Sequence, residues 1–190
     1  MASPKANGRR VVVTGLGIIS PIGTSAQEFW RNLLVGQCGI GPISHWDAGD
    51  YPAHVAGVVN GFDPSNYLDR QQTRRIDRFA QFAVAAAVDA VRQAGLDLNA
   101  EDRDRVGVSV GTAVAGIGVT ESESVMLAAS GPRRVGPMTV PLVIGNMAAC
   151  MISIILKVSG PALCPTGACA TGCMAIGDAL ERVARGERFS

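Results

Sequence analysis

A run of 22 residues without a charged side chain, from 135 to 156, limits what this chain can fold into more than any other feature. About 20 apolar residues are enough to span a bilayer as a helix. This run, however, contains two prolines, Asn146 and Ser153, and it ends at a single Lys157 without the aromatic residues that flank membrane spans. The pattern therefore favours a helix over residues 140–158 that is buried on all sides, in a core or at a dimer contact, over a membrane helix.

The composition indicates one domain with a hydrophobic core. Hydrophobic residues make up 47% of the 190 residues and charged residues 17%, which excludes a disordered chain. Because 17 Lys and Arg residues balance 16 Asp and Glu residues, no overall field attracts nucleic acid or an anionic membrane. Abundant Gly, Ala and Val are typical of α/β proteins, in which small residues let helices lie close to a sheet.

The five cysteines indicate a reducing compartment. Their number is odd, and the first ten residues are polar and lack the apolar segment of a secretory signal, so we expect a cytoplasmic protein with free thiols. Cys164, Cys169 and Cys173 lie close together, but their spacing is not that of paired zinc ligands and no histidine is near. We expect no metal site, and we interpret four cysteines as thiols of the core or near-surface, namely Cys38, Cys150, Cys164 and Cys173.

Strand and helix patterns alternate along the chain. Short apolar runs predict strands over residues 10–14, 54–59, 106–110 and 162–166. Apolar periodicity, capping residues and terminal glycines predict helices over residues 25–36, 68–94, 119–129, 140–158 and 171–185. The first of these helices opens with the capping-box pattern of Ser25 and Glu28. We find no repeat and no domain boundary.

The predicted helix over residues 68–94 has a charged first half and a nearly uncharged second half. Arg70, Arg74 and Arg78 recur every four residues, and Arg75 follows Arg74. We therefore expect these guanidinium groups along one helix face, opposed by only two aspartates. Such a face is either a solvated surface or a binding site for an acidic partner.

Cys169 is the candidate nucleophile. It lies in the string Pro-Thr-Gly-Ala-Cys-Ala-Thr-Gly, residues 165–172, between a predicted strand and a long helix. At a helix N-terminus the unpaired N–H groups and the dipole favour the thiolate, which is the nucleophilic form, and N–H groups of the turn can hold an oxyanion. The alternative is a buried, unreactive cysteine in a tight turn.

Several ordered motifs resemble those of the β-ketoacyl-acyl carrier protein synthase family. Besides the string around Cys169, they are VVVTGLG at 11–17, SPIG at 20–23, GPRR at 131–134, VP at 140–141, NMAA at 146–149 and GP at 160–161. The chain resembles the N-terminal half of the elongating enzyme of bacterial fatty acid synthesis and of type II polyketide ketosynthase subunits. On this basis we expect a flexible N-terminal segment, residues 1–8, and the N-terminal half of a ketosynthase, residues 9–190.

The resemblance implies an α/β, thiolase-like fold with a mixed sheet covered by helices on both faces. It also implies a decarboxylative Claisen condensation, in fatty acid or polyketide chain elongation. Cys169 aligns with the family's nucleophile and would accept an acyl chain from a carrier thioester. A malonyl-carrier thioester would then lose carbon dioxide, and its carbanion would attack the acyl-cysteine. No cofactor and no metal are implied, because the substrates travel on the phosphopantetheine arm of acyl carrier protein.

The resemblance also gives the arginine face a partner. Acyl carrier proteins are acidic, and enzymes of this family dock them on a basic helix. Arg74 and Arg75 match the family's basic pair, whereas Gln71 stands where lysine is common. Arg133 and Arg134 are secondary candidates for the same contact. We therefore expect acyl carrier protein as a partner, and neither nucleic acid nor a membrane.

Family members form homodimers, or heterodimers in polyketide systems, and the resemblance places residues 162–167 near the interface. In the family, two histidines and a lysine from the second half of the chain assist decarboxylation. These 190 residues contain no counterpart, since His45 and His54 lie outside the family's motifs. We therefore expect the 190-residue chain to be inactive by itself.

Two other functions compete with condensation. A non-catalytic partner subunit, like the chain-length factors of polyketide systems, resembles a ketosynthase but lacks the nucleophile, so replacing Cys169 with alanine would discriminate. Residues 11–17 also resemble the first strand and glycine loop of a dinucleotide-binding oxidoreductase. The third glycine of that motif should stand at position 20, which is Ser20, and no acidic residue follows at the distance that the ribose requires.

Overall fold

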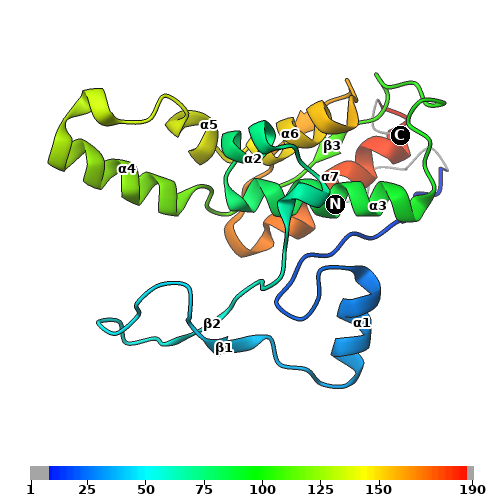
Figure 1. Ribbon diagram of the computed structural model, residues 1–190. Coiled ribbons are helices and arrows are strands. Elements are labelled where there is room, and N and C mark those ends of the chain that lie inside the picture. The colour runs from blue at the N-terminus through cyan, green and yellow to red at the C-terminus, as the bar shows by residue number, and fades with distance from the viewer. Residues whose placement is uncertain (1–8, 188–190) are drawn as a thin grey trace, which may run out of the picture.

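A computed structural model describes residues 9–187, so the expected flexible segment, residues 1–8, lies outside the described residues. The chain forms a larger part with most of the helices and a smaller lobe with α1 and a hairpin (Figure 1). The helices are α1 (Ala26–Leu34), α2 (Arg70–Arg75), α3 (Arg78–Ala94), α4 (Ile117–Ser130), α5 (Thr139–Val143), α6 (Met147–Leu156) and α7 (Thr171–Arg185). The strands are β1 (Ile40–Pro42), β2 (Val55–Gly57), β3 (Val108–Ser109) and β4 (Ala162–Leu163), and three 3-10 turns are η1 (Pro64–Asn66), η2 (Pro132–Arg134) and η3 (Ala168–Ala170).

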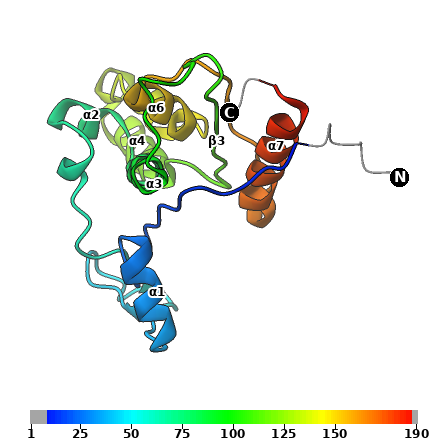
Figure 2. The ribbon, with the colours of Figure 1, turned by 90° about the vertical axis from the view of Figure 1, so that its right-hand side faces the viewer.

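The sheet of the larger part consists of β3 and β4, which pair in parallel with Val108 opposite Ala162. Helix α6 contacts this sheet from one side and α7 contacts it from the other (Figure 2). The predicted α/β class with helices on both faces is thereby confirmed. In the described residues the antiparallel pair β1–β2 forms a separate sheet in the smaller lobe, so parallel and antiparallel strands do not share one sheet.

The core lies where α3 crosses α6. Ala80 and Val84 of α3 and Ala149 of α6 have no exposed surface, and Ala148 and Ile152 are nearly buried. Small side chains let the two helix axes approach closely, as the composition predicts. Full burial of one valine contributes about 1.5–3 kcal/mol, so this contact is the main stabilising feature of the larger part.

The helix predicted over residues 68–94 is two helices. Ile76 takes an extended conformation, with φ −132° and ψ 143°, and this residue ends the first helix. Its side chain is only 2% exposed, so the break in the helix coincides with burial of Ile76. The amide Nε2 of Gln81 then donates to the carbonyl oxygens of Thr73 and Ile76, both at 3.2 Å. The buried glutamine satisfies backbone groups that the break leaves without helical partners.

The helix predicted over residues 140–158 is also interrupted, by a turn at residues 144–146 between α5 and α6. Val140 and Ile154 are 64% and 62% exposed, so the chain itself does not bury this segment on all sides, and its burial at a dimer contact stays a prediction. Only one face of α6, that toward α3 and the β3–β4 sheet, is covered. No helix within residues 9–187 has the length and apolar character needed to cross a membrane.

Residues 10–14, predicted as a buried strand, form no strand. Val12 and Val13 are 64% and 78% exposed. A β-strand forms only beside another strand that accepts and donates its backbone hydrogen bonds, and no strand of the described residues lies beside this segment. The apolar run therefore remains an extended segment that leads to the glycines at 15 and 17.

The smaller lobe agrees with the sequence in part. Helix α1 follows the predicted cap, since Oγ of Ser25 accepts from the N–H of Glu28 at 3.2 Å, whereas the Glu28 carboxylate accepts from Thr24 rather than from the cap residue. The strand predicted over residues 54–59 is β2. The sequence predicts no strand where its partner β1 lies, because two glycines and a proline hide a three-residue strand.

Candidate active site

Cys169 lies at the centre of the short turn η3, immediately before α7, and it is exposed. The chain reaches it from β4, so the predicted order of strand, turn, cysteine and helix is confirmed. Cys169 is neither buried nor in a disulfide, which contradicts the alternative of a buried structural cysteine.

Three backbone N–H groups of the turn are used within it. Gly167 donates to Oγ1 of Thr171 at 2.8 Å, Ala170 donates to the carbonyl of Gly167 at 3.0 Å, and the N–H of Thr171 donates to the carbonyl of Ala168. Within residues 167–171, only the N–H groups of Ala168 and Cys169 are left as candidates to bind an oxyanion. The prediction that N–H groups of the turn bind an oxyanion is thereby limited to these two N–H groups.

The turn lies against the loop that follows β3. A Cβ atom built on Gly111 would stand 2.1 Å from Cγ2 of Thr171 and 2.5 Å from the carbonyl oxygen of Pro165. Only glycine fits there without displacing the turn. On a neighbouring side, a Cβ on Gly145 would contact Thr112 and the thiol of Cys164. Three segments that are distant in sequence, at residues 111–112, 145 and 164–171, therefore meet next to the turn that carries Cys169.

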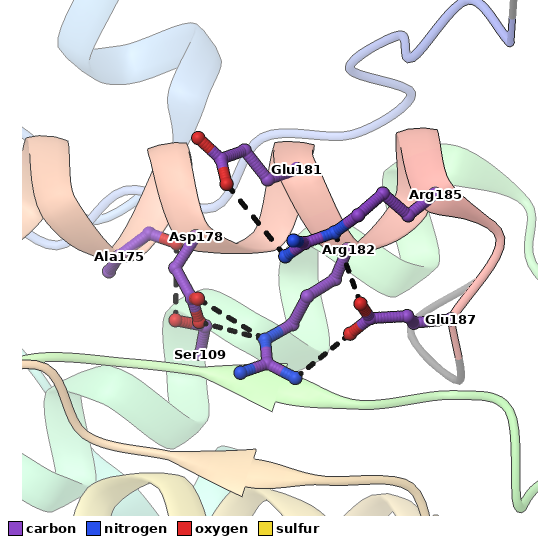
Figure 3. Close-up of polar contacts among 7 residues, drawn as sticks. All are labelled: Ser109, Ala175, Asp178, Glu181, Arg182, Arg185 and Glu187. Atoms are coloured by element: carbon purple, nitrogen blue, oxygen red, sulfur yellow. Dashed lines mark hydrogen bonds and ion pairs between the residues drawn. The ribbon is translucent and has the colours of Figure 1, made fainter. Parts of the chain in front are cut away.

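One hydrogen bond joins helix α7 to the sheet, and ion pairs within α7 and to Glu187 stabilise the end of the helix (Figure 3). Oγ of Ser109 in β3 donates to the carbonyl of Ala175 at 3.1 Å. The ion pairs are Arg182 with Asp178 and Glu187, and Arg185 with Glu181 and Glu187. Because these side chains are partly exposed, each pair contributes little by itself, and the hydrogen bond from Ser109 is the one of these contacts that joins α7 to the sheet.

Three of the four predicted arginines remain together. Arg70, Arg74 and Arg75 are exposed on α2, and with Gln71 and Met138 they line a pocket of about 450 Å³. Within the described residues none of these three arginines forms an ion pair. The surface that they form, called here the α2 face, therefore carries uncompensated positive charge next to an apolar methionine.

Arg78 does not share this face, so the prediction of one helix face with four arginines is wrong. It is the first residue of α3, beyond the break at Ile76. Its guanidinium carbon lies 4.8 Å from the ring centre of Phe62 and 4.8 Å from that of Phe82. A cation held between two aromatic rings stabilises the junction between η1 and α3.

Glycines 15 and 17 have a packing role. A Cβ on Gly15 would stand 2.1 Å from the carbonyl oxygen of Ala90, and one on Gly17 would stand 1.7 Å from that of Ala86. The extended segment thus crosses α3 in direct backbone contact. The glycine spacing that resembles a dinucleotide loop is explained by this contact with a helix.

Two residues of the site were not predicted from the sequence to have a functional role. Thr171 appears only as a small neighbour in the motif of Cys169, and Gly111 only as the start of a loop. The available signal was the glycine directly after the strand at residues 106–110, because a glycine in that place marks a close approach of another backbone. Which backbone approaches it is a property of the tertiary structure.

Comparison with known proteins agrees with this geometry. A family model described as the N-terminal domain of beta-ketoacyl synthase matches residues 8–188. A 3-oxoacyl-[acyl-carrier-protein] synthase 2 of Synechocystis sp. is 43% identical over 178 residues, 94% of this chain and 43% of the relative. The enzyme of the same name from Staphylococcus aureus strain COL is 41% identical over 182 residues, 96% of this chain and 44% of the relative.

A solved structure, the ishigamide ketosynthase/chain length factor, is 31% identical and superimposes with a TM-score of 0.84 over 94% of this chain and 45% of that one. The fold is therefore that of the thiolase-like ketosynthases, and the chain spans less than half the length of the relatives that it matches. With the family model matching nearly all of its residues, this chain belongs to the β-ketoacyl synthase family, through the N-terminal domain.

Proposed function

We propose that the protein is a β-ketoacyl-acyl carrier protein synthase, an acyltransferase that elongates fatty acid or polyketide chains with Cys169 as nucleophile. The observation that carries the proposal is an exposed cysteine at the turn before α7 in a chain of this family. The name shared by relatives at 41–43% identity, 3-oxoacyl-[acyl-carrier-protein] synthase 2, supports the substrate class.

The reaction has two stages. In the first, the Cys169 thiolate attacks the carbonyl carbon of an acyl-carrier thioester, a new carbon–sulfur bond to Cys169 forms, the carbon–sulfur bond to the carrier breaks, and the carrier leaves as its thiolate. In the second, a malonyl-carrier thioester loses carbon dioxide and the resulting carbanion attacks the acyl-cysteine. A carbon–carbon bond then replaces the bond to Cys169, and the thiolate is regenerated.

We assign the decarboxylation step to no residue of this chain. Its two histidines are in the smaller lobe, where His45 makes an edge contact with Trp46 and the carbonyl of His54 accepts from the N–H of Ile43. The chain therefore supplies the acyl-accepting half of the reaction, together with any N–H of the turn at Cys169 that binds the oxyanion.

Acylation of Cys169 needs none of the decarboxylation residues, so the acyl-enzyme can be tested on this chain although we expect no condensation by it alone. The purified protein is incubated with an acyl-acyl carrier protein, and intact-mass and peptide mass spectrometry locate the adduct. We expect one acyl group on Cys169, no adduct in Cys169→Ala, and an unchanged adduct in Cys173→Ala, the matched exposed cysteine on α7. A wild-type protein that stays unmodified while it assembles normally would favour a non-catalytic partner subunit.

We also infer that the α2 face binds acyl carrier protein. Arg70, Arg74 and Arg75 support this because they are exposed cations without acidic partners in residues 9–187, and an acidic carrier would complete them. Arg74→Glu with Arg75→Glu should weaken carrier binding about tenfold or more at low salt. Arg31→Glu reverses a similarly exposed charge in the last turn of α1 and should leave binding unchanged.

The proposal also includes the cellular compartment and the oligomeric state. We infer a cytoplasmic dimer, either of two copies or of two ketosynthase chains, with residues 162–167 at the interface. Within the described residues β4 pairs only with β3, so its other edge can pair with a second chain. Sedimentation of the purified protein should give the mass of a dimer, and a monomer at micromolar concentration would contradict the inference.

A further inference from the structure

We propose that Thr171 is a positioning residue for Cys169, an inference that rests on the proposed function. Its Oγ1 accepts a hydrogen bond of 2.8 Å from the N–H of Gly167, two residues before the nucleophile, while Thr171 itself stands two residues after it. The hydroxyl therefore joins the two ends of the segment that presents the thiol.

The conformation of the Thr171 side chain is restricted by burial and by contact with Gly111. It is 4% exposed, and its methyl group lies over Gly111 in the loop after β3. Threonine has few rotamers, so contact of the methyl group with Gly111 also sets the direction of the hydroxyl. The loop after β3 thus directs Oγ1 toward Gly167, and a serine would keep the hydroxyl without the methyl contact.

The segment that Thr171 closes is strained. Ala168, directly before the nucleophile, has φ +47°, a left-handed conformation that residues with a Cβ atom rarely adopt. Such a conformation persists only when the surroundings hold it. The bonds from Gly167 to Thr171 and from Ala170 to Gly167 are the restraints on either side of Ala168.

Loss of the hydroxyl should release the strain. Without Oγ1, the N–H of Gly167 loses its acceptor, Ala168 relaxes toward negative φ, and Cys169 turns away from the N-terminal end of α7. The thiol then leaves the exposed position that the turn gives it, and it reacts more slowly with an alkylating agent. Cys173, one turn farther along α7, keeps its surroundings.

The test compares alkylation of these two cysteines. Iodoacetamide is applied to the purified protein, and peptide mass spectrometry gives separate rates for Cys169 and Cys173 in Thr171→Val, Thr171→Ala and Thr171→Ser. We expect the ratio of the two rates to fall by about two- to tenfold in the valine and alanine variants, as loss of one hydrogen bond predicts, and to be restored to within a factor of about two by serine.

Three results would overturn the proposal. The first is an unchanged ratio of the two alkylation rates in the valine and alanine variants. The second is a serine variant in which the ratio is as low as in the valine variant. The third is a lower ratio in the alanine variant but not in the valine variant, which would identify packing as the cause. A Cys173 rate equal to that of wild type verifies that α7 is folded, and if the valine variant fails this check the alanine and serine variants decide.

A second measurement separates this inference from the proposed function. The initial rate of acyl transfer from acyl carrier protein should fall in kcat, with KM for the carrier unchanged, because the α2 face is untouched. If wild type forms no acyl-enzyme, the proposed function fails, whereas the alkylation ratio still decides whether Thr171 positions Cys169.

Discussion

Gly111 packs directly against Thr171: a Cβ atom added at position 111 would lie 2.1 Å from Cγ2 of Thr171 and 2.5 Å from the backbone oxygen of Pro165. Because one of these neighbours is backbone, it cannot move aside as a flexible side chain would. Gly111→Ala should therefore destabilise the protein by about 1–3 kcal/mol and slow alkylation of Cys169. Urea unfolding and the iodoacetamide rate at Cys169 measure the two effects.

Gly118 provides the matched control for that substitution. It lies in the first turn of α4, it has no atom within 4 Å of its Cβ position, and its φ is not positive. Gly118→Ala should leave alkylation of Cys169 unchanged and stabilise the helix by up to about 1 kcal/mol. Equal losses of stability in both variants would show that the contact of Gly111 with the turn is unimportant.

Tyr67 makes the stability depend on pH in alkaline solution. Burial first, and then its 2.8 Å hydrogen bond to Asp89, raise the pKa of Tyr67 above its ordinary value of 10.0. Since the folded-state pKa is the higher one, the contribution to stability is complete below pH 10 and is lost as pH rises through the raised pKa. Tyr67→Phe should cost about 1 kcal/mol near neutral pH.

Urea unfolding of wild type and Tyr67→Phe across the alkaline range checks this. The two free energies of unfolding should differ at neutral pH and converge above the raised pKa of Tyr67. A constant difference over the whole range would mean that the pKa of Tyr67 is the same in the folded and unfolded states, which would contradict the prediction. Tyr51, an exposed tyrosine in contact with Trp46, offers the control variant Tyr51→Phe.

Arg78 should contribute to stability rather than to the charge of the α2 face. Its guanidinium carbon lies at the same 4.8 Å from the rings of Phe62 and Phe82. Arg78→Met keeps the length of the side chain but removes the cation, so we expect a loss of about 0.5–2 kcal/mol in urea unfolding. Arg75→Met should leave stability within about 0.5 kcal/mol of wild type, because Arg75 is exposed and unpaired in the described residues.

Gln81 should control the orientation of α2. Its Nε2 donates to the carbonyls of Thr73 and Ile76 from a side chain that is almost fully buried. Gln81→Leu leaves both carbonyl oxygens without this donor and should cost about 1–3 kcal/mol in thermal or urea unfolding. It should also weaken carrier binding, since α2 carries the basic residues.

The exposed Gln37 gives a control for that variant, as Gln37→Leu removes an amide at a position that is not buried. Carrier binding of wild-type strength in Gln81→Leu, measured by calorimetry at the same salt concentration, would contradict the link between Gln81 and the α2 face. A loss of stability in Gln37→Leu equal to that in Gln81→Leu would contradict the role of the buried hydrogen bonds.

The sequence by itself determined the α/β class, the family resemblance and the position of the candidate nucleophile. Cys169 could be assigned because its surroundings are local: a short apolar strand, a glycine turn and a helix of apolar periodicity all lie within about twenty residues of it. The helix predicted over residues 171–185 coincides with α7 for the same reason, since capping and periodicity are properties of neighbouring residues.

The tertiary structure decided the features that depend on distant contacts. Ile76 is buried in the core formed by α3 and α6, and this burial breaks a helix that local propensity alone would continue through Arg78. Residues 10–14 have strand propensity but no neighbouring strand in the described chain. The close approach of Gly111 to Thr171 joins positions 60 residues apart, and side-chain packing of that range leaves no periodic signal in a sequence.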